Sequence, residues 1–390
     1  MDKPKISKTV WVLCIVSLFT DISSEMLYPV MPVYLKSIGF SALIIGLLEG
    51  FAEATAGFSK GYFGNLSDRL GKRSVFVRFG YGLSSISKPM LAAFTFPIWI
   101  FFARAIDRLG KGIRTSARDA ILSSESTPET KGRIFGLHRG LDTAGAFIGP
   151  VFALIFLIFY PDKFVPLFLI AFIPGIFAVF LSFLIKDKTI IPNSNIKGRG
   201  FFSFLKYWKV ASKDYKKLVT GLLFFALMNS SDIFLLLMIK QMGYSSKEVI
   251  GAYIFYNFIY AVFSYPIGAI ADKLGLKNVF ITGLLIFAIV YGGMSLQPSL
   301  PVIFFLFFLY AIYASATESI SKAWITNIAK KEDTATAIGF FTGFSSVYTL
   351  FASIIAGWLW SAFSPSVTFA VSAAGAIFVM IYLIFSFRKI

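Results

Sequence analysis

The sequence predicts an all-α integral membrane protein with twelve transmembrane helices in two pseudo-symmetric six-helix bundles. Its composition is the first reason: of the 390 residues 57% are hydrophobic and 18% are aromatic, and the mean hydropathy is +0.75, far above the values of soluble domains. A second reason is the recurrence of apolar runs of about 18 to 25 residues, the length that a helix needs to cross about 30 Å of hydrocarbon. The third reason is an internal sequence repeat.

Charged or turn-forming segments separate the apolar runs and define the predicted spans. The runs do not alternate polar and apolar residues as the strands of a membrane barrel do. Charged residues interrupt the fourth and fifth spans. In chain order the spans are 9-36, 42-66, 74-95, 97-120, 132-160, 164-186, 215-240, 247-271, 277-297, 300-323, 335-360 and 366-387.

An internal repeat relates the two halves of the chain. The stretch GNLSDRLGKRSVF (Gly64–Phe76) recurs as GAIADKLGLKNVF (Gly268–Phe280), and 268 minus 64 gives an offset of 204 residues. The same offset aligns IGFSA (Ile38–Ala42) with MGYSS (Met242–Ser246). Separate stretches at one offset indicate a duplicated six-helix unit, an arrangement that places substrate sites where the two repeats meet.

A basic connector separates the two predicted bundles. We expect an N-terminal six-helix bundle at 1-186, a cytoplasmic linker at 187-214 and a C-terminal six-helix bundle at 215-390. The FFSFLKYW portion of the linker is partly amphipathic, and we expect it to lie on the anionic lipid surface. A regulatory partner site is the alternative.

The net charge of +17 follows the predicted topology. Basic residues gather in alternate loops, as the positive-inside rule requires of cytoplasmic loops. Examples are Arg69, Lys72, Arg73, Lys131, Arg133, Lys330 and Lys331. We therefore expect both termini to be cytoplasmic, in a plasma membrane such as the bacterial inner membrane. We expect a monomer in the lipid bilayer and no nucleic-acid partner.

Rare residue types exclude several classes of function. One cysteine, Cys14, cannot form a disulfide within the chain, and one histidine, His138, leaves no cluster of soft ligands for a metal. No G-x-x-x-x-G-K-[ST] phosphate-binding loop occurs, which argues against a primary pump. Because the sequence offers no catalytic constellation, we expect neither an enzyme nor a cofactor. A channel and a non-transporting receptor on the same fold are the rival classes.

The first copy of the repeat carries a family signature. It matches the loop 2-3 signature G-x-L-x-D-[RK]-x-G-[RK]-[RK] of the major facilitator superfamily through Gly64, Leu66, Asp68, Arg69, Gly71, Lys72 and Arg73. The chain therefore resembles this superfamily over essentially its whole length. The resemblance implies two six-helix bundles and transport by alternating access. The second copy keeps Gly268, Asp272, Lys273, Gly275 and Lys277.

The residue types of this signature suit a conformational latch. Glycines permit tight turns and close approach of helix ends, and Asp68 can accept hydrogen bonds from a neighbouring helix end or an arginine. We expect Asp272 and Lys273 to form a weaker second latch. We expect Asp68→Asn to impair transport and to leave folding and ligand binding largely intact, because it removes a latch and not a core contact.

A second motif lies in the fifth span. GLHRGLDTAGAFIGP contains Gly136, Gly145, Gly149 and Pro150, and it looks like the antiporter motif of the superfamily without the usual trailing pair of glycines. Small residues at this spacing let helices pack closely. The resemblance implies export in exchange for protons, as in drug:proton antiporters. An ordinary glycine packing face is the alternative.

A charged stripe follows the apolar residues of the fourth span. On a helix the stripe falls within an arc of about 140°, and its members are Arg104, Asp107, Arg108, Lys111, Arg114, Arg118 and Asp119. A cation that faces lipid at membrane depth costs at least about 3 kcal/mol. We therefore expect the stripe to face the central cavity or neighbouring helices.

Carboxylates in other spans are candidates for proton coupling or for lining the substrate cavity. They are Asp21, Glu25, Asp142, Asp232 and Glu318. Asp21 and Glu25 share one helix face, and in the resembling family the first helix lines the cavity, so these two are the first candidates for carrying protons. Structural pairing with the cationic stripe is the alternative, and Lys88 and Arg139 are further cations within the spans.

These observations predict a secondary active transporter that works by alternating access and exports small organic molecules in exchange for protons. An importer or exchanger of an organic anion is the alternative, because the stripe carries more cations than acids. The expected partners are a small-molecule substrate, protons and the lipid bilayer.

Overall fold

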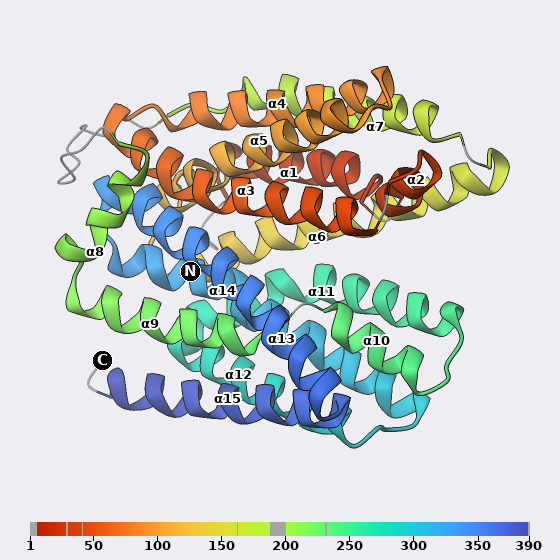
Figure 1. Cartoon of the computed structure of the whole chain (residues 1–390). Helices are drawn as coiled ribbons and strands as arrows, with labels where there is room; N and C mark the ends of the chain where they lie inside the picture. Colours follow the sequence, from red (N-terminus) through yellow and green to blue (C-terminus); the bar gives the residue numbers. More distant parts are fainter. Residues whose placement is uncertain are drawn as a thin grey trace. The chain divides into compact units, whose positions relative to one another are not determined.

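The computed structural model describes residues 6–28, 30–40, 42–161, 163–187, 200–230 and 232–388. In these residues the chain is helical and contains no strand (Figure 1). The predicted all-α fold class is therefore confirmed. Part of the predicted linker, residues 188–199, lies outside the described residues.

The helices follow the predicted spans in order. They are α1 (Lys8–Glu25), α2 (Met31–Ser37), α3 (Ala42–Leu70), α4 (Arg73–Ala93), α5 (Pro97–Ser124), α6 (Lys131–Phe159), α7 (Phe164–Ser182), the 3-10 helix η1 (Phe201–Lys206), α8 (Tyr207–Val210), α9 (Lys213–Met228), α10 (Ile233–Gln241), α11 (Ser246–Leu274), α12 (Leu276–Ser295), α13 (Leu300–Ile328), the 3-10 helix η2 (Lys331–Asp333), α14 (Thr334–Ala362) and α15 (Pro365–Ser386).

Length and composition mark seven helices in the described part of the chain as able to cross a membrane. They are α6, α7, α11, α12, α13, α14 and α15. α5 is not among them, because the charged stripe runs through it. The twelve predicted spans are consistent with the helix order, since each span coincides with one helix or with two consecutive helices.

The helices form two compact units. Unit 1 consists of Met1–Thr127, Leu141–Val210 and Lys330–Gly343, and unit 2 consists of Pro128–Gly140, Ala211–Ala329 and Phe344–Ile390. In unit 1, α4 packs on α5 and α7, α3 packs on α5, and α1 packs on α7. In unit 2, α11 and α12 pack on α13, and α15 packs on α9 and α12. The helices α6 and α14 each contribute their first turns to one unit and their remainder to the other.

The first span of each half folds as two helices, whereas the sequence predicted one helix for each span. Span 9-36 folds as α1 and α2, and span 215-240 folds as α9 and α10. The second break contains Asn229, Ser230 and Asp232, whose short polar side chains favour turns over helix interiors because they compete for backbone hydrogen bonds. The two breaks are equivalent in the repeat, because Glu25 at the end of α1 plus the offset of 204 gives position 229.

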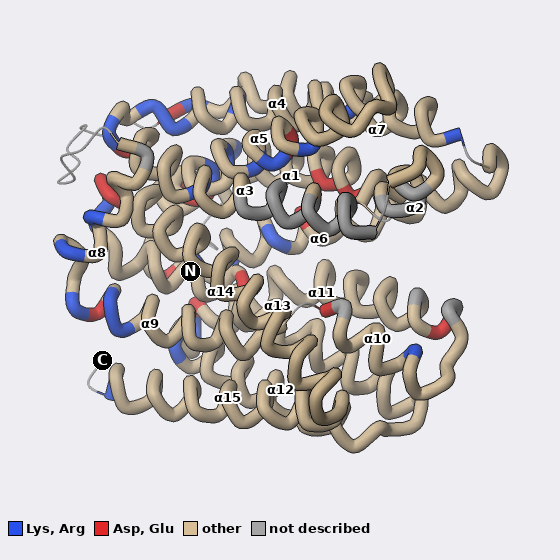
Figure 2. Tube along the Cα trace, viewed as in Figure 1, with Lys and Arg blue, Asp and Glu red and all other residues tan. Residues whose placement is uncertain are grey.

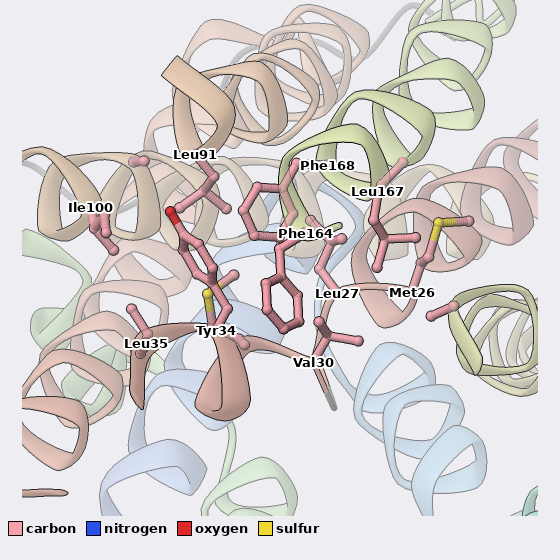
Figure 3. Close-up of a cluster of buried hydrophobic side chains, with 14 of the residues drawn as sticks. Met26, Leu27, Val30, Tyr34, Leu35, Leu91, Ile100, Phe164, Leu167 and Phe168 are labelled. Atoms are coloured by element: carbon pink, nitrogen blue, oxygen red, sulfur yellow. The ribbon is translucent and has the colours of Figure 1, made fainter. Parts of the chain in front are cut away.

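Apolar side chains fill the break in the first span. Tyr34 of α2 lies edge-on to Phe168 of α7, with ring centroids 4.8 Å apart (Figure 3). Met26 and Leu27, in the break itself, are buried in the same cluster. The packing contacts among these apolar side chains stabilise the bent path of the chain. The cluster therefore fixes the acidic end of α1.

The described end of the linker packs on unit 1. Phe204 of η1 is buried against Gly61 of α3, where a Cβ atom would lie 2.6 Å from the ring. Trp208 of α8 stacks on Phe340, with ring centroids 5.5 Å apart and an interplanar angle of 13°. Phe202 is exposed. Contact of this segment with the lipid surface stays a prediction.

Candidate functional site

Unit 1 holds an ionic cluster built around the charged stripe of α5. Arg104, Arg108 and Arg118 are 5%, 7% and 8% exposed, so these cations are packed inside the unit and do not face lipid. Figure 2 shows charged segments along α5 and at the end of α1, whereas α12 is largely without charge. The ionic cluster consists of Asp21, Glu25, Lys88, Arg104, Asp107, Arg108, Lys111, Arg114, Arg118, Asp119 and Asp142.

Lys88 of α4 forms the first ion pair of the cluster. Its Nζ lies 2.8 Å from Asp107 Oδ1 and donates to Ser24 Oγ at 3.1 Å. Arg104 Nη1 lies 3.9 Å from the other oxygen of Asp107. Two cations therefore share one buried carboxylate. Because a desolvated charge costs several kcal/mol unless it is paired, this arrangement ties α4 and α1 to α5.

Two further arginines continue the stripe along α5. Arg114 Nη1 donates to Ser84 Oγ at 2.5 Å, and its guanidinium group lies 4.7 Å from the centroid of the Tyr81 ring, within the range of a cation–π interaction. Arg118 forms an ion pair with Asp119 at 3.0 Å. The cluster thus combines carboxylates, hydroxyl groups and an aromatic face as partners for its cations.

Asp142 of α6 and Asp21 of α1 form the acidic side of the cluster. Ser17 Oγ donates to Asp142 Oδ1 at 2.5 Å, and Arg118 Nη1 lies 4.0 Å from the same oxygen. The carboxyl groups of Asp21 and Asp142 are close electrostatic neighbours. Two ionised carboxylates at such a site repel each other, so a proton on one of them stabilises the arrangement.

Glu25 lies one helical turn beyond Asp21. Its electrostatic neighbours include Lys111 and Arg108 of α5, and Asp21 also interacts with Lys111. The structure therefore brings the two acids that the sequence singled out on α1 together with the cationic stripe. Lys111 is the cation that both acids share.

Unit 2 contains a tyrosine cluster around Asp232. This residue lies in the break between α9 and α10, and the Tyr310 hydroxyl of α13 donates to its Oδ1. No described Lys or Arg forms an ion pair with Asp232, and Arg139 reaches it only as an electrostatic neighbour. The tyrosine cluster consists of Tyr256, Tyr260, Tyr291, Tyr310 and Tyr313, all of which are buried.

Tyr310 lies among the other rings. Its ring centroid is 5.0 Å from that of Tyr256, 5.3 Å from that of Tyr313 and 6.3 Å from that of Tyr291. Asn229 Nδ2, in the same helix break as Asp232, donates to Tyr313 Oη at 3.0 Å. The rings come from α11, α12 and α13. Three helices thus present phenol groups to one polar helix break.

Sequence reasoning missed this tyrosine cluster, although part of its signal is visible. Tyr256 and Tyr260 are four residues apart on α11, and Tyr310 and Tyr313 are three apart on α13, which places each pair on one helix face. Such spacing predicts an aromatic face. It does not reveal that both faces meet at Asp232.

Glu318 pairs with a cation instead of standing alone. Arg139 Nη2 forms an ion pair with Glu318, its Nε donates to Tyr260 Oη at 2.7 Å, and its guanidinium group lies 5.2 Å from the Tyr260 ring centroid. The sequence analysis identified Arg139 as a cation within the spans but did not predict which acid it pairs with. Among the described residues no group of three or more His, Cys, Asp or Glu side chains could hold a metal ion.

Asp68 caps a helix end, as the latch interpretation requires, but it also belongs to the core. Its carboxylate accepts from Arg73 Nη2 at 2.7 Å and from the backbone N–H and hydroxyl group of Thr336, at 2.7 and 3.0 Å. Asp68 and Arg73 are 1% and 2% exposed. Because Asp68→Asn would leave a buried arginine without its counter-charge, we expect this change to lower stability as well as to impair transport.

Glycines serve two purposes around Asp68. Gly71 has a φ of +64° and lets the chain turn at once after α3. Gly64 lies inside α3, and a Cβ atom there would be 2.5 Å from the carbonyl oxygen of Ala335. The neighbouring basic residues Arg69 and Lys72 lie at the end of α3 and in the turn that follows.

Asp272, in the predicted second latch, caps the equivalent helix end with different partners and is less buried than Asp68. Asp272 accepts from the backbone N–H groups of Gly132 and Arg133 at 2.7 and 3.1 Å. Gly132 and Thr336 are equivalent in the repeat, since 336 minus 132 gives 204. Lys277 stands at the place of Arg73, but it donates to the carbonyl group of Phe387. Lys273 lies next to Asp272 in the last turn of α11.

Comparison with known proteins identifies the family. The model of the Major Facilitator Superfamily matches residues 13–258 and 249–389. The chain belongs to this superfamily. An uncharacterised MFS-type transporter of Methanocaldococcus jannaschii is 34% identical over 387 residues, which are 98% of this chain and 95% of that protein.

Two further members of the superfamily resemble the chain less closely. Citrate exporter 1 of Aspergillus niger is 26% identical over 153 residues, which are 38% of this chain and 29% of that protein. The crystal structure of the human organic anion transporter MFSD10 (TETRAN) has a TM-score of 0.80 at 16% sequence identity, and the match covers 98% of this chain and 100% of that chain. The major facilitator fold is thereby confirmed.

Membership of the Major Facilitator Superfamily fixes the broad class of function. Its members are membrane transporters, so the protein is a multi-pass transporter that acts on small molecules in a lipid bilayer, and it is not an enzyme. The predicted family, fold class and class of function are confirmed at this level. The roles of individual site residues stay predictions.

In this superfamily member the antiporter-like motif lies within α6, with Pro150 inside the helix. A Cβ atom at Gly136 would collide with a carbonyl oxygen of α11 in unit 2. A Cβ atom at Gly145 would lie 2.6 Å from the carbonyl oxygen of Leu18 of α1 in unit 1, and Gly149 also lies against α1. The glycines therefore allow close helix packing on both units, and their link to antiport stays a prediction.

Proposed function

We propose that the protein exports small organic molecules in exchange for protons, by alternating access. The observation that carries this proposal is that the carboxyl groups of Asp21 and Asp142 are close electrostatic neighbours, next to Glu25 and the cations of the ionic cluster. In a transporter of this superfamily such a pair offers a place for a proton to bind and leave. The export direction is supported by the relative that is named a citrate exporter.

Loss of a proton from this site would change the pairing within the ionic cluster. While one of Asp21, Glu25 and Asp142 holds a proton, that group attracts Lys111 only weakly. Once the proton leaves, two adjacent carboxylates repel each other and compete for Lys111. Because Asp21 and Asp142 belong to different helices, the exchange of partners shifts α1 against α6 within unit 1.

Conformational change completes the proposed cycle. The hydrogen bonds of Asp68 to Thr336 and of Asp272 to Gly132 are the contacts that we expect to break and re-form as the bundles at 1-186 and 215-390 move. The proposal includes cytoplasmic termini, a location in a plasma membrane such as the bacterial inner membrane, and a monomeric transporter.

Transport into proteoliposomes tests the function. A thermal-shift screen of the purified protein at two pH values first finds ligands, and a labelled ligand is then offered to proteoliposomes with an imposed pH gradient. We expect accumulation above the external concentration, and we expect nigericin to abolish it by collapsing the gradient. Ligands that equilibrate but never accumulate would contradict proton coupling and leave only facilitated transport.

An importer or exchanger of an organic anion is the second candidate, because the ionic cluster holds six cations and five carboxylates. The cations are Lys88, Arg104, Arg108, Lys111, Arg114 and Arg118, and the carboxylates are Asp21, Glu25, Asp107, Asp119 and Asp142. Counterflow of citrate or benzoate distinguishes the two candidates. Anion counterflow that nigericin does not change favours the exchanger.

A further inference from the structure

The carboxyl group of Asp232 lies in the helix break of unit 2, and no described Lys or Arg forms an ion pair with it. Its hydrogen bond from Tyr310 satisfies one oxygen, but a phenol group cannot cancel a full charge. Arg139 does not serve this purpose, because its guanidinium group is paired with Glu318 and lies over the Tyr260 ring. A carboxylate in this setting is costly, and it is retained in membrane proteins where it binds a partner.

The surroundings of Asp232 favour a positive charge on an organic group. Tyr256, Tyr291, Tyr310 and Tyr313 are all electrostatic neighbours of its carboxylate. The face of an aromatic ring carries negative potential and attracts cations, above all organic ammonium groups with apolar substituents. Inorganic cations need several oxygen ligands at one point, so competition with Na⁺ and K⁺ distinguishes an inorganic cation site from an ammonium site.

The helix break adds two more features that carry negative electrostatic potential. The amide oxygen of Asn229 is buried and accepts no hydrogen bond from the described residues, while the Nδ2 of Asn229 donates to Tyr313 Oη. α9 ends at Met228, so its last carbonyl groups present the negative end of the helix dipole to this break. A ligand that brings positive charge and an N–H donor satisfies both.

We propose that unit 2 contains a binding subsite for an organic ammonium group. The Asp232 carboxylate supplies the counter-charge, the rings of Tyr256 and Tyr310 supply the aromatic faces, and the Asn229 amide oxygen accepts an N–H donor. The inference rests on the proposed transport of small organic molecules, and it names the class of substrate that unit 2 recognises: aryl or alkyl amines that are protonated at neutral pH.

Ligand binding to the full-length protein in detergent tests the subsite without any transport. Isothermal titration calorimetry measures the dissociation constant of benzyltrimethylammonium. We expect Asp232→Asn to weaken binding about tenfold or more, because it removes the charge and keeps the side-chain shape. We expect Tyr256→Leu to weaken it about three- to thirtyfold and Tyr256→Phe, which keeps the ring, to leave it unchanged.

Matched controls separate this subsite from general effects. Asp214→Asn removes an exposed carboxylate from the same helix, α9, and it should leave binding unchanged. Benzoate has the ring with the opposite charge, and its binding should not weaken in Asp232→Asn. Protonated N,N-dimethylbenzylamine, which has one N–H, should bind more tightly than benzyltrimethylammonium, and Asn229→Ala should remove that preference.

Three results would overturn the subsite. They are wild-type affinity for the ammonium probe in Asp232→Asn, equal losses for benzoate and the ammonium probe, and displacement of the probe by Na⁺ but not by K⁺, which would indicate an inorganic cation site. If Asp232→Asn does not fold, as judged by size-exclusion chromatography, the Tyr256→Leu and Tyr256→Phe pair decides. Because the binding experiment uses no proton gradient, a negative binding result would not contradict the proposed proton exchange. Equally, an absence of transport in proteoliposomes would not contradict a positive binding result.

Discussion

The ionic cluster of unit 1 and the tyrosine cluster of unit 2 handle charge within a membrane protein in different ways. In unit 1, cations and carboxylates neutralise one another, as Lys88 and Asp107 do at 2.8 Å. In unit 2, Asp232 has phenol groups around it and no ion-pair partner among the described residues. Ion pairs that can exchange partners suit proton transfer, whereas an uncompensated carboxylate suits a charged ligand.

This difference indicates that the two halves of a duplicated chain need not have the same function. The repeat is retained in the latches, where Asp68 and Asp272 cap equivalent helix ends. It has diverged in the interior, where unit 1 carries a charged stripe and unit 2 carries tyrosines. Our proposals accordingly place proton coupling in unit 1 and recognition of an ammonium group in unit 2.

Breaking one ion pair of unit 1 should have the largest effect on stability. Asp107→Asn leaves Lys88, which is 2% exposed, without its counter-charge, and we expect a loss of about 3–5 kcal/mol in the free energy of unfolding. Denaturant titration in detergent measures it. The control is Asp214→Asn, which breaks the pair with Lys217 at a surface where both side chains are 49% exposed, and it should cost about 0–1 kcal/mol. Similar small losses in both variants would show that the cluster is well solvated.

In unit 2 a single hydroxyl group should matter less than a charge does in unit 1. Tyr310→Phe removes the donor to Asp232 and keeps the ring, so we expect a loss of about 1.5–3 kcal/mol, the range for a hydrogen bond to a charged group. Tyr265→Phe on α11 is the control, because Tyr265 is 38% exposed. A stability of Tyr310→Phe equal to that of the control would mean that Asp232 does not depend on the tyrosine cluster.

A methyl group on α6 should disturb unit 1 and spare unit 2. The new Cβ atom of Gly145→Ala would lie 2.6 Å from the Leu18 carbonyl oxygen and 2.9 Å from Asp21 Cβ, so we expect a loss of about 1–3 kcal/mol from overpacking. Gly82→Ala is the control, since nothing lies within 4 Å of a Cβ atom there. Binding of benzyltrimethylammonium should be unchanged in Gly145→Ala. A large loss of binding would indicate that the ionic cluster and the tyrosine cluster are more strongly coupled than we propose.

Local patterns made much of the fold predictable. Helix positions follow from apolar runs, and the latch loop follows from the spacing around Asp68. The inward direction of the stripe follows from the cost of exposing Arg104 or Arg108 to lipid. The distant partner of Asp68 was not predictable, because Thr336 lies 268 residues further along the chain and no local pattern links them.

The tyrosine cluster and the helix breaks show where sequence reasoning ended. A break such as the one at Asn229 is short and polar, and its flanking apolar runs together have the length of one span. Tyr256, Tyr291 and Tyr310 belong to three helices, so only packing brings them together. The pairing of Lys88 with Asp107 also depends on how α4 packs against α5, which the charge pattern does not specify.

We propose that Asp21 and Glu25 in unit 1, with Asp142 beside them, carry the coupling protons, and pH-gradient-driven accumulation in proteoliposomes is the direct test. We predict that Glu25→Gln abolishes uphill accumulation and keeps counterflow exchange, because binding and the conformational change do not need the proton, and that Asp21→Asn shows a milder or shifted pH profile. Asp232→Asn, measured at saturating substrate, should retain coupling. Uphill accumulation by the double variant Asp21→Asn with Glu25→Gln would contradict the account and move the coupling site to Asp142, Asp232 or Glu318.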